Sequence, residues 1–268
     1  MRNLFDTLLE YDSIYLSSRP GMGDTTIIVN MADAYLQSVA GKNIAIFAYN
    51  FESSRRITAS DSYGARFMAR ESDTEFYDLI RFRKSEAFGG KKIPQNDRIV
   101  YFEGRGFTLN DVEEKMANTN DIGIVFLDTP IFSVTNNISY VSYPPLPATY
   151  EEIEKALQWF KDRDIKVVWA NSLGRRVERR IRPLPRRSDF IKEHILFDIT
   201  VSIYRAEYYL YDNFIKIRTD KGWRKVAHKF NQVCLPKREE IRIFHQGKRR
   251  AQVVPVSFDL GHQRVTEK

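Results

Sequence analysis

Short apolar runs alternate with longer amphipathic segments along the chain as far as Tyr204. This alternation is typical of β-α-β units and predicts an α/β fold, a mostly parallel sheet flanked by helices. The strands that it predicts are residues 13–17, 43–49, 98–102, 122–127, 165–170 and 199–204.

Helical spacing of apolar residues predicts a first helix over residues 25–39, and Gly41 follows it as a stop signal. The charged stretch 53–84 is expected to form two further helices. Thr149 and Glu152 form a capping box that opens another helix, which ends at Arg163. The preceding segment, 131–148, is a long loop with prolines and tyrosines, and loops of this length inside compact domains are usually functional.

Beyond Tyr204 the apolar runs become shorter, which predicts antiparallel strands at one edge of the sheet. These strands are expected at residues 213–218 and 225–230. The end of the chain predicts an appended β-hairpin that turns near Gly247, with strands at residues 241–244 and 251–256. We therefore divide the chain into an α/β domain of residues 1–235 and a C-terminal extension of residues 236–268.

The composition, 43% hydrophobic and 29% charged residues among 268, is that of a globular protein. No apolar run approaches the roughly 18 residues that span a bilayer, and no signal-peptide region opens the chain, so we expect a cytoplasmic protein without a membrane partner. The single cysteine, Cys234, excludes an internal disulfide and a cysteine zinc site. The four histidines show no ligand spacing, and no metal site is expected.

Basic residues outnumber acidic ones by 42 to 35, which gives a net charge of +7 and a pI near 9.3. This excess permits a nucleic-acid partner without requiring one. Residues 175–187 form a basic cluster, which contains seven arginines and a single acidic residue, Glu178. Its members are Arg175, Arg176, Arg179, Arg180, Arg182, Arg186 and Arg187.

The segment from Ser18 to Thr25 lies between the first predicted strand and the first predicted helix, where a phosphate-binding loop belongs. In such a loop a lysine neutralises the outer phosphates and a Ser or Thr hydroxyl holds Mg²⁺. Here Asp24 stands at the lysine position. Two unit charges about 4 Å apart interact by ~4 kcal/mol at an effective dielectric near 20, so this exchange opposes triphosphate binding. A carboxylate at a helix N-terminus is itself stabilising, and Asp24 is expected to occupy the anion site internally. The alternative is a coincidental turn.

These segments, in their order over about residues 13–231, resemble the C-terminal RecA-type motor domain of DnaB-type replicative helicases. Ser18–Thr25 is similar to that family's Ala-Arg-Pro-Ser-Met-Gly-Lys-Thr loop, 43–51 to its second strand, and 124–130 to its Walker B strand. Residues 167–180 are similar to its sensor strand and the segment that follows. The resemblance implies a RecA-like fold and a degenerate nucleotide loop. The residues of that loop are Arg19, Pro20, Gly21, Gly23, Asp24, Thr25 and Thr26.

The departures from the family pattern fall on its catalytic positions. Besides Asp24, the resemblance places Asn50 where the family has its catalytic glutamate and Ser172 where it has its sensor glutamine. Asn50 cannot accept a proton as a carboxylate does. Thr25 and Asp128, which face Mg²⁺ in the family, are retained. We therefore expect a pseudo-ATPase without a cofactor, which would use Mg-ATP only if the loop is functional.

Lys216 and Arg218 resemble the Lys-x-Arg pair that such motors present to the neighbouring subunit's nucleotide. The alternative is a pair of solvated charges on an edge strand.

Two loops resemble those that face DNA in the family's ring channel. The first carries Tyr140 and Tyr143, whose rings could stack on unpaired bases or pack on the domain itself. The second carries the basic cluster, whose guanidinium groups suit phosphates. That cluster could also form a solvated surface or meet an acidic protein.

The resemblance implies a role in DNA replication or recombination, with single-stranded DNA and a replicative helicase or another replication protein as partners. Because the first strand begins near residue 13, the family's N-terminal helical domain is expected to be absent and self-assembly into a hexamer is not expected. The alternatives are an active ATP-dependent helicase or translocase and a non-catalytic interaction module that does not bind DNA.

Overall fold

The computed structural model describes the chain in eleven segments. They are residues 3–19, 22–49, 58–72, 74–84, 96–133, 147–173, 177, 184–205, 214–219, 222–227 and 239–268. Within them, no helix combines the length and the apolar character that crossing a membrane requires.

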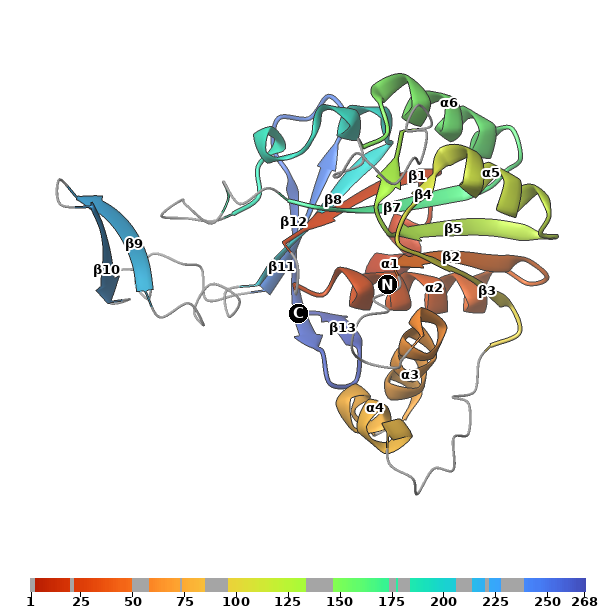
Figure 1. The fold of residues 1–268 in the computed structure, drawn as a ribbon, viewed down its shortest axis with the longest axis horizontal. Helices are drawn as coiled ribbons and strands as arrows, with labels where there is room; N and C mark the ends of the chain where they lie inside the picture. The colour runs from red at the N-terminus through yellow and green to blue at the C-terminus, as the bar shows by residue number, and fades with distance from the viewer. Residues whose placement is uncertain are drawn as a thin grey trace.

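The described strands build a nine-stranded sheet whose larger part is parallel (Figure 1). Its six parallel strands match the six that the apolar runs predict, within one or two residues at most ends. In their order across the sheet they are β8 (Ile199–Arg205), β1 (Ser13–Ser18), β7 (Lys166–Ser172), β5 (Ile122–Asp128), β2 (Asn43–Tyr49) and β3 (Ile99–Gly104).

An antiparallel edge is also present, and it contains the predicted C-terminal hairpin, whose two strands and turn near Gly247 are confirmed. It consists of β11 (Glu239–His245), β12 (Gln252–Asp259) and β13 (Arg264–Glu267), with β11 paired to β8 along seven residues. The strands β9 (Phe214–Thr219) and β10 (Gly222–Ala227) pair with each other in a separate sheet. The two antiparallel strands predicted at residues 213–218 and 225–230 are therefore confirmed within three residues. Their predicted place at the edge of the large sheet is wrong, because alternating apolar residues identify a strand but not its neighbour.

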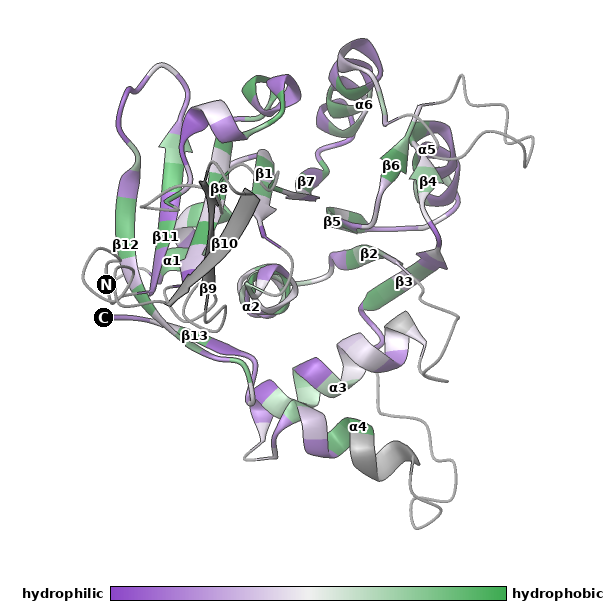
Figure 2. Cartoon of the chain, turned by 60° about the vertical axis from the view of Figure 1, so that its left-hand side comes forward, coloured by the Kyte–Doolittle hydropathy of each residue, from purple (hydrophilic) through white to green (hydrophobic). Residues whose placement is uncertain are grey.

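Helices cover both faces of the sheet (Figure 2). A separate apolar cluster lies under each layer of helices. One layer contributes Leu4, Met31 and Tyr63, which pack with the C-terminal Val256 in one core. The second layer of helices packs on the opposite face of the sheet, over the other apolar cluster. The first layer contains α1 (Leu4–Leu8), α2 (Asp24–Ser38) and α3 (Ala59–Glu71), with α4 (Phe76–Lys84) against α3; the second contains α5 (Leu109–Ala117) and α6 (Tyr150–Lys161).

The predicted capping box at Thr149 is confirmed, because its side chain accepts the Glu152 N–H and the Glu152 side chain accepts the Thr149 N–H. A second capping box, Thr108 with Asp111, opens α5, which the sequence analysis missed. The remaining short elements are β4 (Phe107–Thr108), β6 (Ile131–Phe132) and two 3₁₀ helices, η3 (Arg187–Asp189) and η4 (Lys192–Leu196).

Candidate functional site

The segment between the end of β1 at Ser18 and the start of α2 at Asp24 lies where the sequence predicts a phosphate-binding loop. Gly23 caps the helix with φ 102°, a left-handed conformation that favours glycine. A Cβ at this position would lie 3.2 Å from the ring of Phe258, which belongs to the C-terminal strand β12. The C-terminal extension therefore packs against the loop.

Asp24 is the first residue of α2, so its carboxylate lies at the positive end of the helix dipole. Its Oδ1 accepts the N–H of Thr25 at 3.1 Å. Burial raises the pKa of Asp24, while the N–H groups at the helix start and the Ser18 hydroxyl oppose that rise. The helix terminus is thus occupied by a carboxyl group that belongs to the chain.

Asp128 is the last residue of β5, and its carboxyl group lies near the start of α2. Its Oδ2 accepts the Tyr63 hydroxyl at 2.6 Å and the Thr25 hydroxyl at 3.2 Å. Burial, and then the charge of Asp24, raise the pKa of Asp128 from 3.8 to about 6. The structure thereby brings together Asp24, Thr25 and Asp128, three of the sequence-predicted residues.

The cation that acts on both carboxylates is Arg66 of α3, whose charge lowers the pKa of Asp24 and of Asp128. Its guanidinium nevertheless points to the C-terminal extension. Nη1 of Arg66 donates to Oε1 of Gln263 at 2.5 Å, and the guanidinium carbon lies 4.2 Å from the ring centroid of Phe76.

Gln263 joins the C-terminal turn to the start of α2. Its Oε1 also accepts the Thr26 hydroxyl at 3.0 Å, and its backbone carbonyl accepts the Asn30 amide at 2.8 Å. Its φ of 54° is left-handed, and its side chain is buried. The last strand pair therefore helps to fix the geometry of the loop.

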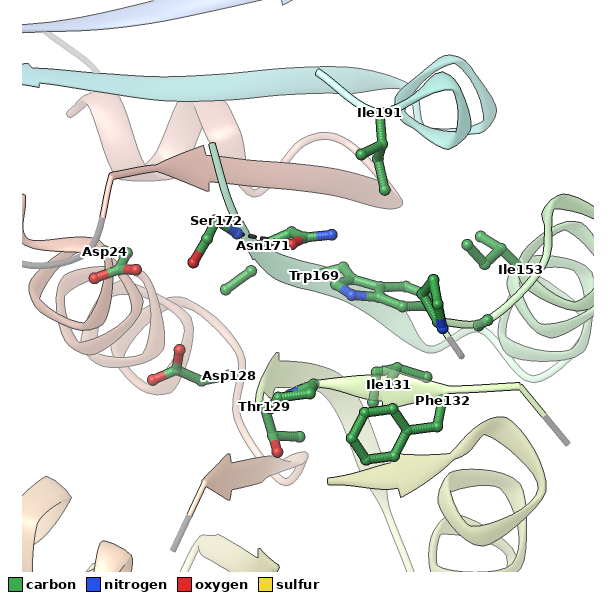
Figure 3. A pocket seen from close by; sticks show the side chains of 14 residues that line it. Asp24, Asp128, Thr129, Ile131, Phe132, Ile153, Trp169, Asn171, Ser172 and Ile191 are labelled. Atoms are coloured by element: carbon green, nitrogen blue, oxygen red, sulfur yellow. Dashed lines mark hydrogen bonds between the residues drawn. The ribbon is translucent and has the colours of Figure 1, made fainter. Parts of the chain in front are cut away.

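A cavity of about 300 Å³ opens beside the two carboxylates, at the carboxyl ends of β5 and β7 (Figure 3). Asp24 and Asp128 lie at one end of it, and Ser172 and Asn171 line one side. Its remaining wall is largely apolar. The apolar side chains of that wall include Ile131, Phe132, Ile153, Trp169 and Ile191.

Other predicted residues take part in local contacts. Nη1 of Arg19 donates to the Leu173 carbonyl at 2.6 Å, and the Ser172 N–H donates to Oδ1 of Asn171 at 2.7 Å. Nη2 of Arg187 donates to the carbonyls of His245 and Lys248 and so holds the turn between β11 and β12.

The remaining candidates are not placed in detail. Lys216 and Arg218 belong to β9, of which the backbone alone is described. The others lie outside the described residues: Pro20, Gly21, Asn50, Tyr140, Tyr143, Arg175, Arg176, Arg179, Arg180 and Arg182.

Sequence reasoning missed Tyr63, Arg66 and Gln263. The helix that carries the first two was predicted, but the charge pattern of 53–84 does not tell which polar residue faces the sheet. Nothing near Gln263 in the sequence links it to Thr26, which lies 237 positions away along the chain. In the described part of the chain, no three His, Cys, Asp or Glu side chains gather into a metal-binding group.

No family model matches the sequence, and no curated protein matches it in a sequence search. Solved structures do match. The chain is similar to the separately solved ATPase domain of a DnaB-like helicase, with a TM-score of 0.61 and 16% identity over 98% of this chain and 89% of that one. It is also similar to a DnaB-like replicative helicase whose structure describes its interactions with primase. That match has a TM-score of 0.54 and 16% identity over 95% of this chain and 57% of that one.

The fold is therefore the RecA-like α/β fold of DnaB-like helicase ATPase domains, as the sequence predicted. The chain spans 57% of the second helicase chain. At 16% identity the likeness establishes the fold, and the activity has to be argued from the site.

Proposed function

We propose that this protein is a helicase-fold protein that does not hydrolyse ATP and that acts in DNA replication or recombination by binding single-stranded DNA and a helicase-type partner. One observation carries the first part. The lysine position of the loop holds Asp24, and burial, followed by the charge of Asp24, raises the pKa of a second carboxyl group, Asp128.

The electrostatics of this arrangement oppose a triphosphate. A phosphate at the start of α2 would meet two carboxylates where a functional loop offers a lysine and one carboxylate. The nearby cation, Arg66, is held by Gln263 and Phe76. The residues present therefore do not fit Mg-ATP, although Thr25 and Asp128 keep the contact expected on the Mg²⁺ side.

A basic surface supports the DNA-binding part. Lys248, Arg249 and Arg250 are consecutive and exposed in the turn between β11 and β12. Arg187 holds this turn through its carbonyls, and the exposed Arg186 is adjacent to Arg187 in sequence. Several such cations on one surface are the usual footprint of phosphate-backbone binding.

Phosphate release from Mg-ATP, measured with and without single-stranded DNA, tests the proposal. The expected result is a rate no higher than that of the Asp128→Ala variant. Hydrolysis that exceeds background and disappears in Asp128→Ala would instead establish the rival function, an active RecA-type ATPase, which the retained contact between Thr25 and Asp128 favours.

A further inference from the structure

The cavity beside Asp24 and Asp128 has two chemically different ends (Figure 3). The two carboxylates are the charged side chains in its wall, and no basic side chain lines it among the described residues. The rest of the wall is mainly apolar and contains the indole of Trp169. Its volume of about 300 Å³ is at the lower end of the range for ligand sites, roughly 300–1,000 Å³.

The charge at the carboxylate end is not balanced from within the described chain. Both hydrogen bonds that described residues donate to Asp128 end on Oδ2, which leaves Oδ1 for a ligand. Arg66 compensates one of the two charges but is bonded to Gln263, on the C-terminal turn, and does not line the cavity. One negative charge is left over when both carboxylates are ionised.

We propose that this cavity binds an organic cation, an ammonium or guanidinium group on a short apolar stem, with the charged head against Asp24 and Asp128 and the stem against Trp169 and Ile131. The inference rests on the proposed function, because a nucleotide phosphate would require the same end of the cavity. The chemistry is that of a Lys or Arg side chain from a partner protein, or of a free alkylamine.

The wall favours this ligand over a bare metal ion. A divalent cation needs about six oxygen ligands and would leave the apolar wall uncovered. An alkyl stem would cover that wall, which includes the indole of Trp169.

Calorimetric titration of the whole chain at low salt tests the inference with two matched pairs of probes. Butylguanidinium and butylurea have similar shapes and differ in charge. Acetyl-Ala-Arg-Ala-amide and its citrulline counterpart place the same pair of groups in a peptide. We expect the cations to bind and the neutral partners not to bind. Asp128→Asn should weaken cation binding by about tenfold or more, since it removes one member of a desolvated charge pair.

Asp162→Asn, which removes an exposed carboxylate at the end of α6, is the control and should bind as the unchanged chain does. Tighter binding of the peptide than of butylguanidinium assigns the site to a partner's side chain, and the reverse order assigns it to a free cation. Equal binding of the neutral probes, binding unaffected by Asp128→Asn, or binding of Mg²⁺ alone would overturn the inference. If the cations do not bind, the proposed cation site is wrong but the proposal that the chain does not hydrolyse ATP is unaffected. Binding of Mg-ATP would contradict the proposed function itself.

Discussion

At the scale of single residues, the proposed function depends on Asp24, the first residue of α2, which the sequence analysis places at the lysine position of a phosphate-binding loop. An ionised carboxylate at that position has the same sign of charge as a phosphate. Asp128 lies near Asp24, and burial, followed by the charge of Asp24, raises the pKa of Asp128. The pair is stabilised by hydrogen bonds from Tyr63 and Thr25 and by the charge of Arg66.

The raised pKa of Asp128 predicts an unusual dependence of stability on pH. The pKa of Asp128 is about 6 in the folded chain and near 3.8 in the unfolded chain, so the folded state binds the proton more tightly. Stability should therefore fall as pH rises from about 4 to about 6, and the penalty should persist above that range.

Asp128→Asn removes the charge but keeps an oxygen that can accept the Tyr63 hydroxyl. We expect urea unfolding to show a variant that is more stable than the unchanged chain at pH 8 by roughly 1–3 kcal/mol, at about 1.4 kcal/mol per pKa unit, with no gain at about pH 4. Asp162→Asn should change little at either pH. Lower stability of Asp128→Asn at pH 8 would show that the carboxylate is held by a cation instead.

At the scale of elements, the C-terminal strand pair is part of the site. The turn between β12 and β13 places Gln263 against α2 and α3, where its Oε1 accepts from both Thr26 and Arg66. The neighbouring Gly261 carbonyl accepts the N–H of Phe76 at the start of α4. One short turn thus connects three helices of the same layer.

Gln263→Ala should destabilise the fold, because it leaves the half-buried Arg66 guanidinium and the buried Thr26 hydroxyl without their acceptor. We expect a loss of roughly 1–3 kcal/mol in the free energy of unfolding, measured by chemical denaturation. Gln37→Ala, at an exposed position of α2, is the control and should stay within about 0.5 kcal/mol. An equal effect of the two substitutions would show that the turn does not support the site.

Much of the element order was predictable from the sequence. The buried parallel strands are continuous apolar runs bounded by polar residues, and such runs specify strands strongly. The pairing of β11 with β12 was predicted as a hairpin, whereas the pairing of β11 with β8 was not predictable. Residues 213–218 and 239–245 both alternate, and only packing in three dimensions decides that Ile241 pairs with Ile203 of β8. Local signals also failed for α5, whose nine residues form a short amphipathic helix.

The candidate site was predictable in part. The order of segments places Asp24, Thr25 and Asp128 together, and the structure brings them into contact. The contributions of Tyr63, Arg66 and Gln263 could not be predicted, because each depends on the orientation of an element across the fold and not on a local motif.

At the scale of the whole molecule, the net charge of +7 and the basic turn at Lys248–Arg250 determine the expected response to salt. Single-stranded DNA should bind with an affinity that falls steeply with salt. Replacing Lys248, Arg249 and Arg250 by alanine should reduce the slope of log K against log salt by about 2, at ~0.7 per phosphate contact.

Lys155→Ala, at an exposed position of α6, is the control for the loss of a positive charge and should leave the slope nearly unchanged. The double substitution Arg179→Ala with Arg180→Ala tests the basic cluster in the same assay. Undetectable DNA binding at low salt would remove DNA as a partner and favour an acidic protein on the same surface.

The central claim, that the chain's own carboxylate occupies the phosphate position, is tested most directly by calorimetric titration with Mg-ATP. The unchanged chain should give no binding heat at concentrations where Asp24→Lys binds, because that substitution restores the attractive charge at the start of α2. Asp162→Lys makes the same change of charge away from the site and should not bind. Saturable binding of Mg-ATP to the unchanged chain, no weaker than to Asp24→Lys, would contradict the account.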